Sequence, residues 1–288
     1  MSIIKERLEL RAPAKINLFL KVLGPRADGY HDLYSLMARL ELADFLVLEP
    51  LERPLKAADS LTYEGFGDPA DLGFRDNNLA LKALAALRAL NPDLSYFGVY
   101  IQKNIPLAAG LGGGSSDAAA ILLALGPKLG LSQSQLLSLG LSLGSDLPFF
   151  FGPKMALVEG RGEIISPWSG ACPKWALLVN PGFPLATGRV FRELALTKRA
   201  EDHTLWPQSP LGGCPFGEND LLAPALRLEP RLLEAQKELE SLGGLFFGLS
   251  GSGPTFWVLF ATHEEAKEAR ASLKARPWLS ILTALASD

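Results

Sequence analysis

From Leu8 to Val22 the chain alternates apolar and mostly polar residues. The clearest part of the alternation reads Lys15, Ile16, Asn17, Leu18, Phe19, Leu20, Lys21 and Val22. A period of two residues is typical of a strand with one buried face, because successive side chains point to opposite sides of a sheet. The pattern therefore predicts an early strand from which Lys15 and Asn17 project on the same side.

Shorter apolar runs predict further strands. A turn-rich stretch after Val22 leads into an expected strand over residues 34–42, and another follows over 44–48. Residues 51–76 are rich in Pro, Gly and Asp and indicate loops with at most a short strand. Later strands are expected over residues 96–102, 175–179, 246–249, 255–260 and 281–284.

Helices are predicted from apolar spacing and from capping residues. The run after Asn77 and Asn78 has mostly helical spacing, and either asparagine can cap it. Ser132 with Gln135 forms a capping-box pattern at a later helix start. The expected helices span residues 79–90, 118–125, 133–143 (which Gly144 can end), 219–242 (with Asn219 as a candidate cap) and 263–274 (after a second capping box, Thr262 with Glu265).

The order of these elements favours one fold class. Strands and helices are mixed without the regular alternation of a doubly wound sheet, which indicates an α+β protein. We expect a domain boundary between residues 160 and 170, giving domains 1–163 and 164–288. Residues 200–216 carry Trp, Pro and Gly and predict a loop that acts as a lid or a linker.

Composition and charge mainly exclude classes of function and site. The 288 residues, 48% of them hydrophobic, suffice for a sizeable core. A net charge of −3 gives no broad attraction to nucleic acid or anionic membranes. Cys172 and Cys214 stand apart with only three histidines in the chain, which argues against a zinc site or a disulfide framework. The charged N-terminal stretch and the lack of a run of roughly 20 apolar residues predict a cytoplasmic protein without nucleic-acid or membrane partners.

The most informative segment for chemistry is the glycine-rich stretch from Pro106 to Asp117. Its four glycines allow the backbone to turn and to approach a ligand without a Cβ in the way. The stretch runs into an apolar helix, and free amides at a helix start suit a phosphate group. The hydroxyls of Ser115 and Ser116 would add hydrogen bonds or reach a bound Mg²⁺.

Other meanings of such a loop are weaker. A flexible Gly/Ser linker would not lead straight into a packed helix. The Walker pattern fails because no Lys-Ser/Thr pair follows the glycines, and a dinucleotide-binding turn would open directly off a strand. The HRD and DFG sequences of protein kinases are absent. By itself the loop predicts a phosphate site without identifying the enzyme.

Three segments together resemble the GHMP kinases, the family of galactokinase, homoserine kinase and mevalonate kinase. They are APAKINLFL from residue 12, PLAAGLGGGSS from residue 106 and LSGSGP from residue 249, in the family's order and spread over nearly the whole chain. RADGYH from residue 26 and GSDLPF from residue 144 sharpen the match to the branch that phosphorylates the 2-hydroxyl of a cytidine-diphosphate-linked methylerythritol. The resemblance implies a two-domain fold with a ribosomal-protein-S5-like, ATP-binding N-terminal domain and a ferredoxin-like, substrate-side C-terminal domain.

The resemblance also implies residue roles. Asp146 resembles the base that accepts the hydroxyl proton, and Lys15 the ammonium that lowers the pKa of that hydroxyl and offsets charge on the moving phosphoryl group. On spacing alone, a helix N-cap before Pro148 is the favoured role for Asp146, and a solvated lysine at a strand edge is the alternative for Lys15. The implied ATP-binding residues are Pro106, Leu107, Ala108, Ala109, Gly110, Leu111, Gly112, Gly113, Gly114, Ser115 and Ser116.

The substrate's cytosine requires stacking and hydrogen bonds at its edge. The residues that resemble the family's substrate contacts are Asn17, Tyr30, His31, Thr187, Phe191, Gly251 and Gly253. Core packing is the alternative for Tyr30 and Phe191, a surface position for His31, and a plain hairpin turn for the two glycines. These alternatives stay open at this point.

Two positions depart from the family's usual pattern. Ser145 stands where alanine is usual, and Asp117 where some members have asparagine, which adds a negative charge near the expected phosphates. No residue clearly supplies a carboxylate for a metal, so we expect Mg²⁺ to arrive with ATP, held largely by phosphate oxygens and water. A monomer or weak homodimer is expected. Rival functions are another GHMP kinase, a decarboxylase on the same fold, or a catalytically silent ligand sensor.

Overall fold

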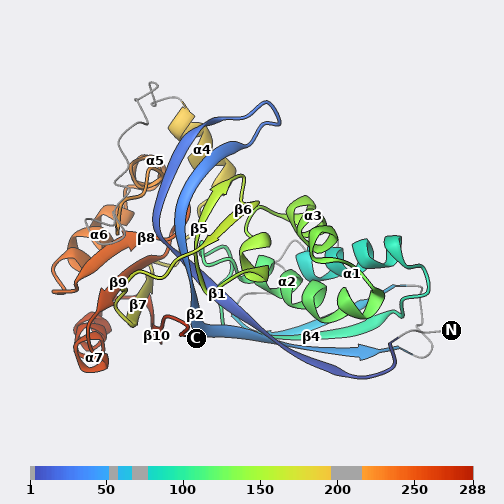
Figure 1. The fold of residues 1–288 in the computed structure, drawn as a ribbon. Helices are drawn as coiled ribbons and strands as arrows, with labels where there is room; N and C mark the ends of the chain where they lie inside the picture. Colours follow the sequence, from blue (N-terminus) through green and yellow to red (C-terminus); the bar gives the residue numbers. More distant parts are fainter. Residues whose placement is uncertain (1–3, 52–57, 67–76, 196–215, 288) are drawn as a thin grey trace. The chain divides into compact units, whose positions relative to one another are not determined.

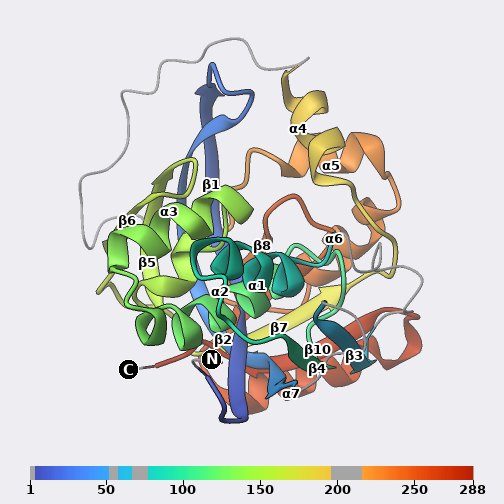
Figure 2. The ribbon, with the colours of Figure 1, turned by 90° about the vertical axis from the view of Figure 1, so that its right-hand side faces the viewer.

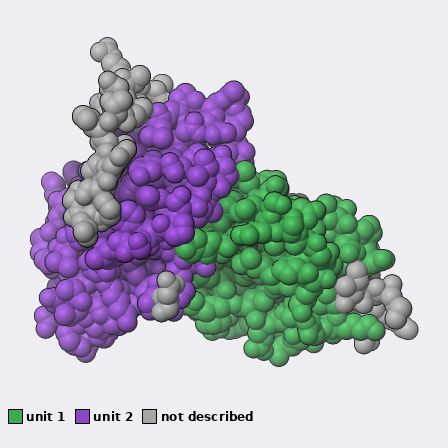
Figure 3. Space-filling view, viewed as in Figure 1, with its two compact units in different colours: residues 1–14, 42–107, 112–153 green, residues 15–41, 108–111, 154–288 purple. Residues whose placement is uncertain are grey.

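The computed structural model describes residues 4–51, 58–66, 77–195 and 216–287. Within it the chain forms two compact units, coloured separately in Figure 3. Unit 1 comprises residues 1–14, 42–107 and 112–153, and unit 2 comprises residues 15–41, 108–111 and 154–288. The loop predicted over 200–216 lies outside the described residues except for Phe216.

Unit 1 is a small sheet covered by helices. Its strands are the first part of β1 (Leu8–Pro25), the second part of β2 (His31–Pro50), β3 (Ser60–Gly65) and β4 (Phe97–Lys103). Strand β4 pairs antiparallel with β2 over Phe45–Pro50 and parallel with β3. The helices are α1 (Leu79–Leu90), α2 (Gly113–Leu125) and α3 (Gln133–Leu143), with short 3-10 turns at Pro127–Leu129 and Pro148–Phe151. Figures 1 and 2 show the helices gathered on one face of these strands.

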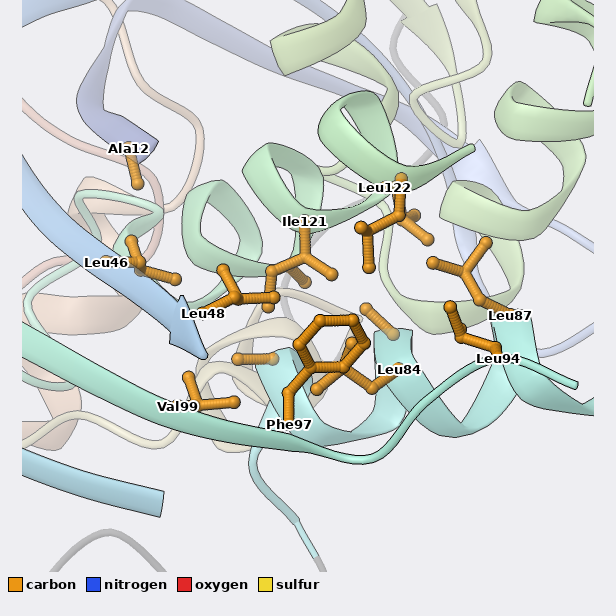
Figure 4. Packing of buried hydrophobic residues seen from close by; sticks show 14 of the residues in the cluster. Ala12, Leu46, Leu48, Leu84, Leu87, Leu94, Phe97, Val99, Ile121 and Leu122 are labelled. Atoms are coloured by element: carbon orange, nitrogen blue, oxygen red, sulfur yellow. The ribbon is translucent and has the colours of Figure 1, made fainter. Parts of the chain in front are cut away.

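The core of unit 1 lies between these helices and the sheet. Phe97 of β4 is fully buried in one cluster with Leu84 of α1 and Ile121 of α2, and Figure 4 also shows side chains of this cluster that come from β1, β2 and the segment before β4. Burying an aliphatic or aromatic side chain of this size stabilises the fold by about 1.5–3 kcal/mol. This packing fixes α2, and with it the end of the glycine-rich segment.

Unit 2 contains strand pairs of β2 with β5 (Met155–Gly160) and of β5 with β6 (Ile164–Pro167), together with a separate four-stranded sheet. The sheet has the order β10-β7-β9-β8, with every neighbouring pair antiparallel. Its strands are β7 (Trp175–Asn180), β8 (Phe246–Leu249), β9 (Phe256–Phe260) and β10 (Leu279–Ala284). Helices α4 (Thr187–Ala195), α5 (Leu222–Leu228) and α6 (Leu232–Glu240) follow β7, and α7 (His263–Ser272) with the 3-10 turn Leu273–Ala275 follows β9. This order and pairing are those of a ferredoxin-like sheet.

Several expectations are confirmed in detail. Helices α1 and α3 have the predicted bounds, Asn78 caps α1 through its side chain, and both capping boxes are present. The short strand expected within residues 51–76 is β3. The predicted α+β class and the two-domain fold are confirmed. The predicted boundary at residues 163/164 cuts the chain once, whereas each compact unit is built from three separate stretches of it. The boundary therefore stays a prediction.

The prediction of a half-exposed first strand was wrong. Lys15, Asn17 and Phe19 are at most 3% exposed, and the apolar residues Ile16 and Leu18 between them are fully buried. The alternation correctly indicated two chemically different faces of the strand. The polar face is nevertheless buried, because the loops that contain Leu111 and Ser250 pack against it. The two strands predicted over 34–42 and 44–48 form one continuous strand, β2.

Two helix predictions also need correction, and some elements were not predicted. Helix α2 begins at Gly113 rather than Ala118, because Gly112 adopts the left-handed conformation that starts it and the small residues after it follow helically. The helix predicted over 219–242 is two helices, since Pro230 cannot continue an i to i−4 ladder and Glu229 before it is non-helical. Helix α4 and strands β5 and β6 were missed. Among the described residues, no helix combines the length and apolar character needed to cross a membrane.

Candidate active site

The side chain of Lys15 lies inside unit 2, held by a chain of hydrogen bonds. Its Nζ donates to Asn17 Oδ1 at 2.7 Å, and Asn17 Nδ2 donates to Ser35 Oγ at 2.9 Å. Ser35 Oγ in turn donates to the carbonyl of Phe19 at 2.6 Å. Lys15 and Asn17 therefore share a face of β1, as the alternation predicts. A buried ammonium needs polar partners to offset its lost hydration, so a solvated lysine at a strand edge is excluded.

Part of the glycine loop lies against this pair. The amide of Lys15 donates to the carbonyl of Leu111 at 2.9 Å. Ser250 Oγ donates to the carbonyl of Gly110 at 2.9 Å and accepts from the amide of Asn17 at 3.4 Å. Three segments more than 90 residues apart along the chain thus meet within unit 2: β1, the loop at residues 108–111, and the turn after β8.

Close packing explains the glycine at position 110, and a positive φ explains the one at position 251. A Cβ on Gly110 would lie 2.4 Å from the Ser250 carbonyl oxygen, a distance that heavy atoms do not tolerate. A Cβ on Gly251 would lie 3.5 Å from Lys15 Nζ and from Asn17 Oδ1, and the φ of Gly251 is +57°. A side chain at position 251 would therefore point toward the buried ammonium of Lys15.

The remaining part of the loop belongs to unit 1 and begins α2. Gly112 is its N-cap and has no side chain that could accept a hydrogen bond. The N–H groups of the first turn therefore have no acceptor within the helix. Ser116 is buried, and its Oγ has no hydrogen-bond partner among the described residues. Uncapped amides at the positive end of a helix dipole, with an orphaned hydroxyl beside them, fit an anion such as phosphate.

Asp146 lies in unit 1, in the turn between α3 and the 3-10 turn at Pro148. Gly144 ends α3, and its carbonyl accepts from the amide of Leu147 at 3.2 Å. The N-cap position before Pro148 is taken by Leu147. Asp146 is therefore the residue before the N-cap position, not the N-cap residue itself.

The residues predicted to contact a nucleobase lie together in unit 2. The rings of His31, at the start of β2, and Phe191, in α4, are 5.0 Å apart between centroids and tilted by 33°. Thr187 Oγ1 and Ser252 Oγ lie 2.9 Å apart, which links α4 to the turn containing Gly251 and Gly253. Tyr30 is 47% exposed, so it is not a core residue. Partly exposed aromatic rings at the end of a hairpin suit stacking on a planar ligand.

Known proteins are similar to this chain in sequence over most of its length. The model of the GHMP kinase N-terminal domain matches residues 78–152, and the model of the GHMP kinase C-terminal domain matches residues 215–277. The protein named 4-diphosphocytidyl-2-C-methyl-D-erythritol kinase in Geobacter metallireducens is 38% identical over 270 residues, which are 92% of this chain and 94% of that protein. The chain belongs to the GHMP kinase family.

Solved structures agree with this family assignment. The crystal structure of a 4-(cytidine 5'-diphospho)-2C-methyl-D-erythritol kinase superimposes with a TM-score of 0.74 and 32% identity, covering 97% of this chain and all of the other. The mevalonate kinase of Methanococcus jannaschii, at 15% identity and a TM-score of 0.67, shares the fold. The GHMP kinases are ATP-dependent phosphotransferases, and this chain is such an enzyme.

This GHMP kinase also buries a charged cluster beneath the start of α2. Lys103 Nζ lies 2.5 Å from Asp44 Oδ2 and 2.8 Å from Asp117 Oδ2, and all three side chains are at most 5% exposed. Asp44 Oδ1 also accepts from the amides of Asn104 and Ile105, at 2.6 and 2.8 Å. By contrast, Asp117 Oδ1 has no hydrogen-bond partner within the described part of the chain.

Burial raises the pKa of Asp117 to about 7; the ammonium of Lys103 opposes this shift, and the carboxylate of Asp44 adds to it. For Lys103, burial alone would lower the pKa, but the two carboxylates outweigh it and the pKa is raised. The cluster therefore carries one uncompensated negative charge when Asp117 is ionised and none when it is protonated. Sequence reasoning noted Asp117 as a departure but missed Lys103 and Asp44, which have no motif in common.

Replacing Asp117 by asparagine is expected to stabilise the protein at pH 8 but not at pH 4. The folded protein holds the Asp117 proton up to about pH 7, whereas the unfolded chain releases it near 3.8, so wild-type stability falls as pH rises through that window. The variant lacks this loss and should gain about 1–3 kcal/mol in the free energy of unfolding at pH 8, measured by urea denaturation. Asp44→Asn, which weakens charge-assisted bonds to two backbone amides, should destabilise at both pH values. Parallel stability curves for wild type and Asp117→Asn would contradict the raised pKa.

Other residues of the site carried no signal in the sequence. Ser35 and Trp257 hold Asn17 in place, the indole Nε1 donating to the Asn17 carbonyl at 2.9 Å. Ser250 and Ser252 lie inside the LSGSGP segment, where only the glycines were singled out. No group of three or more His, Cys, Asp or Glu arranged for a metal ion occurs among the described residues.

Proposed function

We propose that this enzyme transfers the γ-phosphoryl group of ATP to the 2-hydroxyl of 4-diphosphocytidyl-2-C-methyl-D-erythritol, giving the 2-phosphate and ADP in non-mevalonate isoprenoid precursor synthesis. The observation that carries the proposal is the buried Lys15 ammonium, which is hydrogen-bonded to Asn17 and backed by the glycine loop and by Gly251. The names of relatives at 38% and 32% identity support the choice of acceptor.

The residues present fit ATP. The uncapped start of α2 and the orphaned hydroxyl of Ser116 would hold its phosphates, and residues 106–111 would line the approach to them. ATP with Mg²⁺ supplies the phosphoryl group and neutralises part of its charge. Mg²⁺ would be held by phosphate oxygens and water, with the hydroxyls of Ser115 and Ser116 as available protein ligands.

The chain's own contribution to transfer is a proton acceptor and a fixed positive charge. Asp146 accepts the proton of the substrate hydroxyl as its oxygen attacks phosphorus. Lys15 favours the oxyanion form of that hydroxyl and offsets the charge that develops on the phosphoryl oxygens. Because Asn17 and Ser35 already hold Lys15, no reorganisation is needed at the moment of reaction.

Recognition of the cytidine end falls to unit 2. Tyr30 stacks on the cytosine, His31 contacts its edge, Phe191 supplies a second ring and Thr187 a hydrogen bond. Asn17, Gly251 and Gly253 contact the methylerythritol side. The ring contact of His31 with Phe191 and the link of Thr187 to Ser252 support a common site for these residues.

ADP release against a panel of acceptors tests the proposal. We expect kcat/KM for the cytidyl methylerythritol to exceed that for homoserine and mevalonate by roughly 10²-fold or more, since a site built for a polar base rejects acceptors lacking it. Preferred turnover of homoserine or mevalonate would assign another GHMP kinase activity. Carbon dioxide release would indicate a decarboxylase, and binding without turnover of any acceptor a silent sensor.

The setting of the enzyme forms part of the proposal. We place it in the cytoplasm as a monomer or a weak homodimer whose partner is the small-molecule substrate. A net charge of −3 supports the absence of a nucleic-acid partner.

A further inference from the structure

The tip of the β1–β2 hairpin carries an arginine contact that sequence reasoning did not anticipate. The guanidinium carbon of Arg161, in the turn between β5 and β6, lies 3.7 Å from the centroid of the Tyr30 ring. The pairing of Leu33 with Gly160 in the β2–β5 ladder brings the two turns together. A planar guanidinium at this distance is stacked on the face of the ring.

Acidic residues hold both members of this stack. Asp28 Oδ1 accepts from the amide of Tyr30 at 3.1 Å, and Asp28 Oδ2 lies 3.8 Å from Arg161 Nη1. The amide of Arg161 donates to Glu163 Oε2 at 2.6 Å. The hydrogen bond from Tyr30, with the charges of Arg26 and Arg161, lowers the pKa of Asp28, so this carboxylate remains ionised at neutral pH.

Arg161 and Tyr30 differ in their exposure. The side chain of Arg161 is 20% exposed, whereas Tyr30 is 47% exposed. A guanidinium stacked on one face leaves the opposite face of an exposed ring for another planar group. A Tyr30 ring that is already fixed in place loses less conformational entropy when a ligand binds, and the adjacent cation polarises the ring.

We infer that Arg161 is a positioning residue for the nucleobase: it holds Tyr30 so that the outer face of the ring stacks on the cytosine of the substrate. The inference rests on the proposed cytidine specificity and adds a residue to it. Arg161 acts through Tyr30, so its contribution disappears when the ring is absent. A direct role of the guanidinium with the substrate's diphosphate would instead persist without the ring.

A double-mutant cycle with CDP as the probe separates these possibilities. By isothermal titration calorimetry, Arg161→Met should weaken CDP binding roughly three- to tenfold and leave ADP binding unchanged. Tyr30→Ala should weaken CDP binding at least as much, and the double variant should bind CDP no more weakly than Tyr30→Ala alone. Arg161→Lys should restore little of the loss, because an ammonium lacks the planar stacking surface.

Each other result has a defined meaning. CDP binding that Arg161→Met leaves unchanged, additive losses in the double variant, or full rescue by lysine overturns the positioning role and leaves the proposed function standing. A wild-type protein that binds ADP but not CDP overturns the cytidine specificity, and the inference with it. Should Arg161→Met fail to fold, the same cycle run with Arg161→Lys decides the question.

Discussion

Asp146→Asn is expected to lower kcat by roughly 10³-fold, because an amide cannot accept the proton of the attacking hydroxyl. The substitution keeps the size of the side chain in the turn between α3 and Pro148. Binding of ATP should change little, since the expected phosphate contacts come from the start of α2. Steady-state ADP release with the cytidyl methylerythritol, together with calorimetric titration of the nucleotide, measures both quantities.

A nearby serine provides the control for this variant. Ser145→Ala changes the same turn without touching the carboxylate, and it should retain kcat within about threefold. Turnover near the wild-type value in Asp146→Asn would remove Asp146 from the mechanism. A matching loss in Ser145→Ala would assign the effect to the turn rather than to the proton acceptor.

Lys15→Met should reduce kcat by roughly 10²-fold or more, because it removes a fixed positive charge at the position where negative charge develops. The methionine fills most of the lysine's volume, but it leaves Asn17 Oδ1 without the donor that now lies 2.7 Å away. Lys15→Arg should not restore activity, since the site is buried and the planar guanidinium is larger than the ammonium that donates to Asn17 Oδ1.

Lys21→Met is the matched control, because Lys21 lies on the same strand and its ammonium pairs with Glu218 at 2.6 Å. It should keep kcat within about threefold of wild type. Equal losses in the two lysine variants would show that the strand, and not the Lys15 ammonium, is what activity requires. A circular dichroism spectrum of each variant confirms that the sheet is retained.

Local sequence signals were sufficient where the deciding contacts are local. Asn78 caps α1, and Ser132 with Gln135 caps α3, through bonds that span two or three residues. Such contacts form within one turn of helix, so residue order alone determines them. The split between α5 and α6 was also readable in principle, since Pro230 marks it.

The glycine-rich segment, the lysine of the first strand and the turn at residues 249–254 are likewise recognisable as motifs from the sequence alone. Their residue types state what chemistry is available: backbone amides, an ammonium and a close approach of chain to ligand. The same motifs connect this protein to the GHMP kinases. Their order along the chain was therefore enough to indicate the family.

Only the tertiary structure decided how these parts are assembled. Asn17 meets Ser35 across 18 residues, and Ser250 meets Gly110 across 140. The alternation in β1 distinguished two faces, but it could not predict that loops would cover the polar one. The sequence also gave no sign that Asp117 would share a buried site with Lys103 and Asp44. Sequence encodes the periodicity and chemistry of each element, whereas burial and pKa depend on neighbours that only the folded chain brings near.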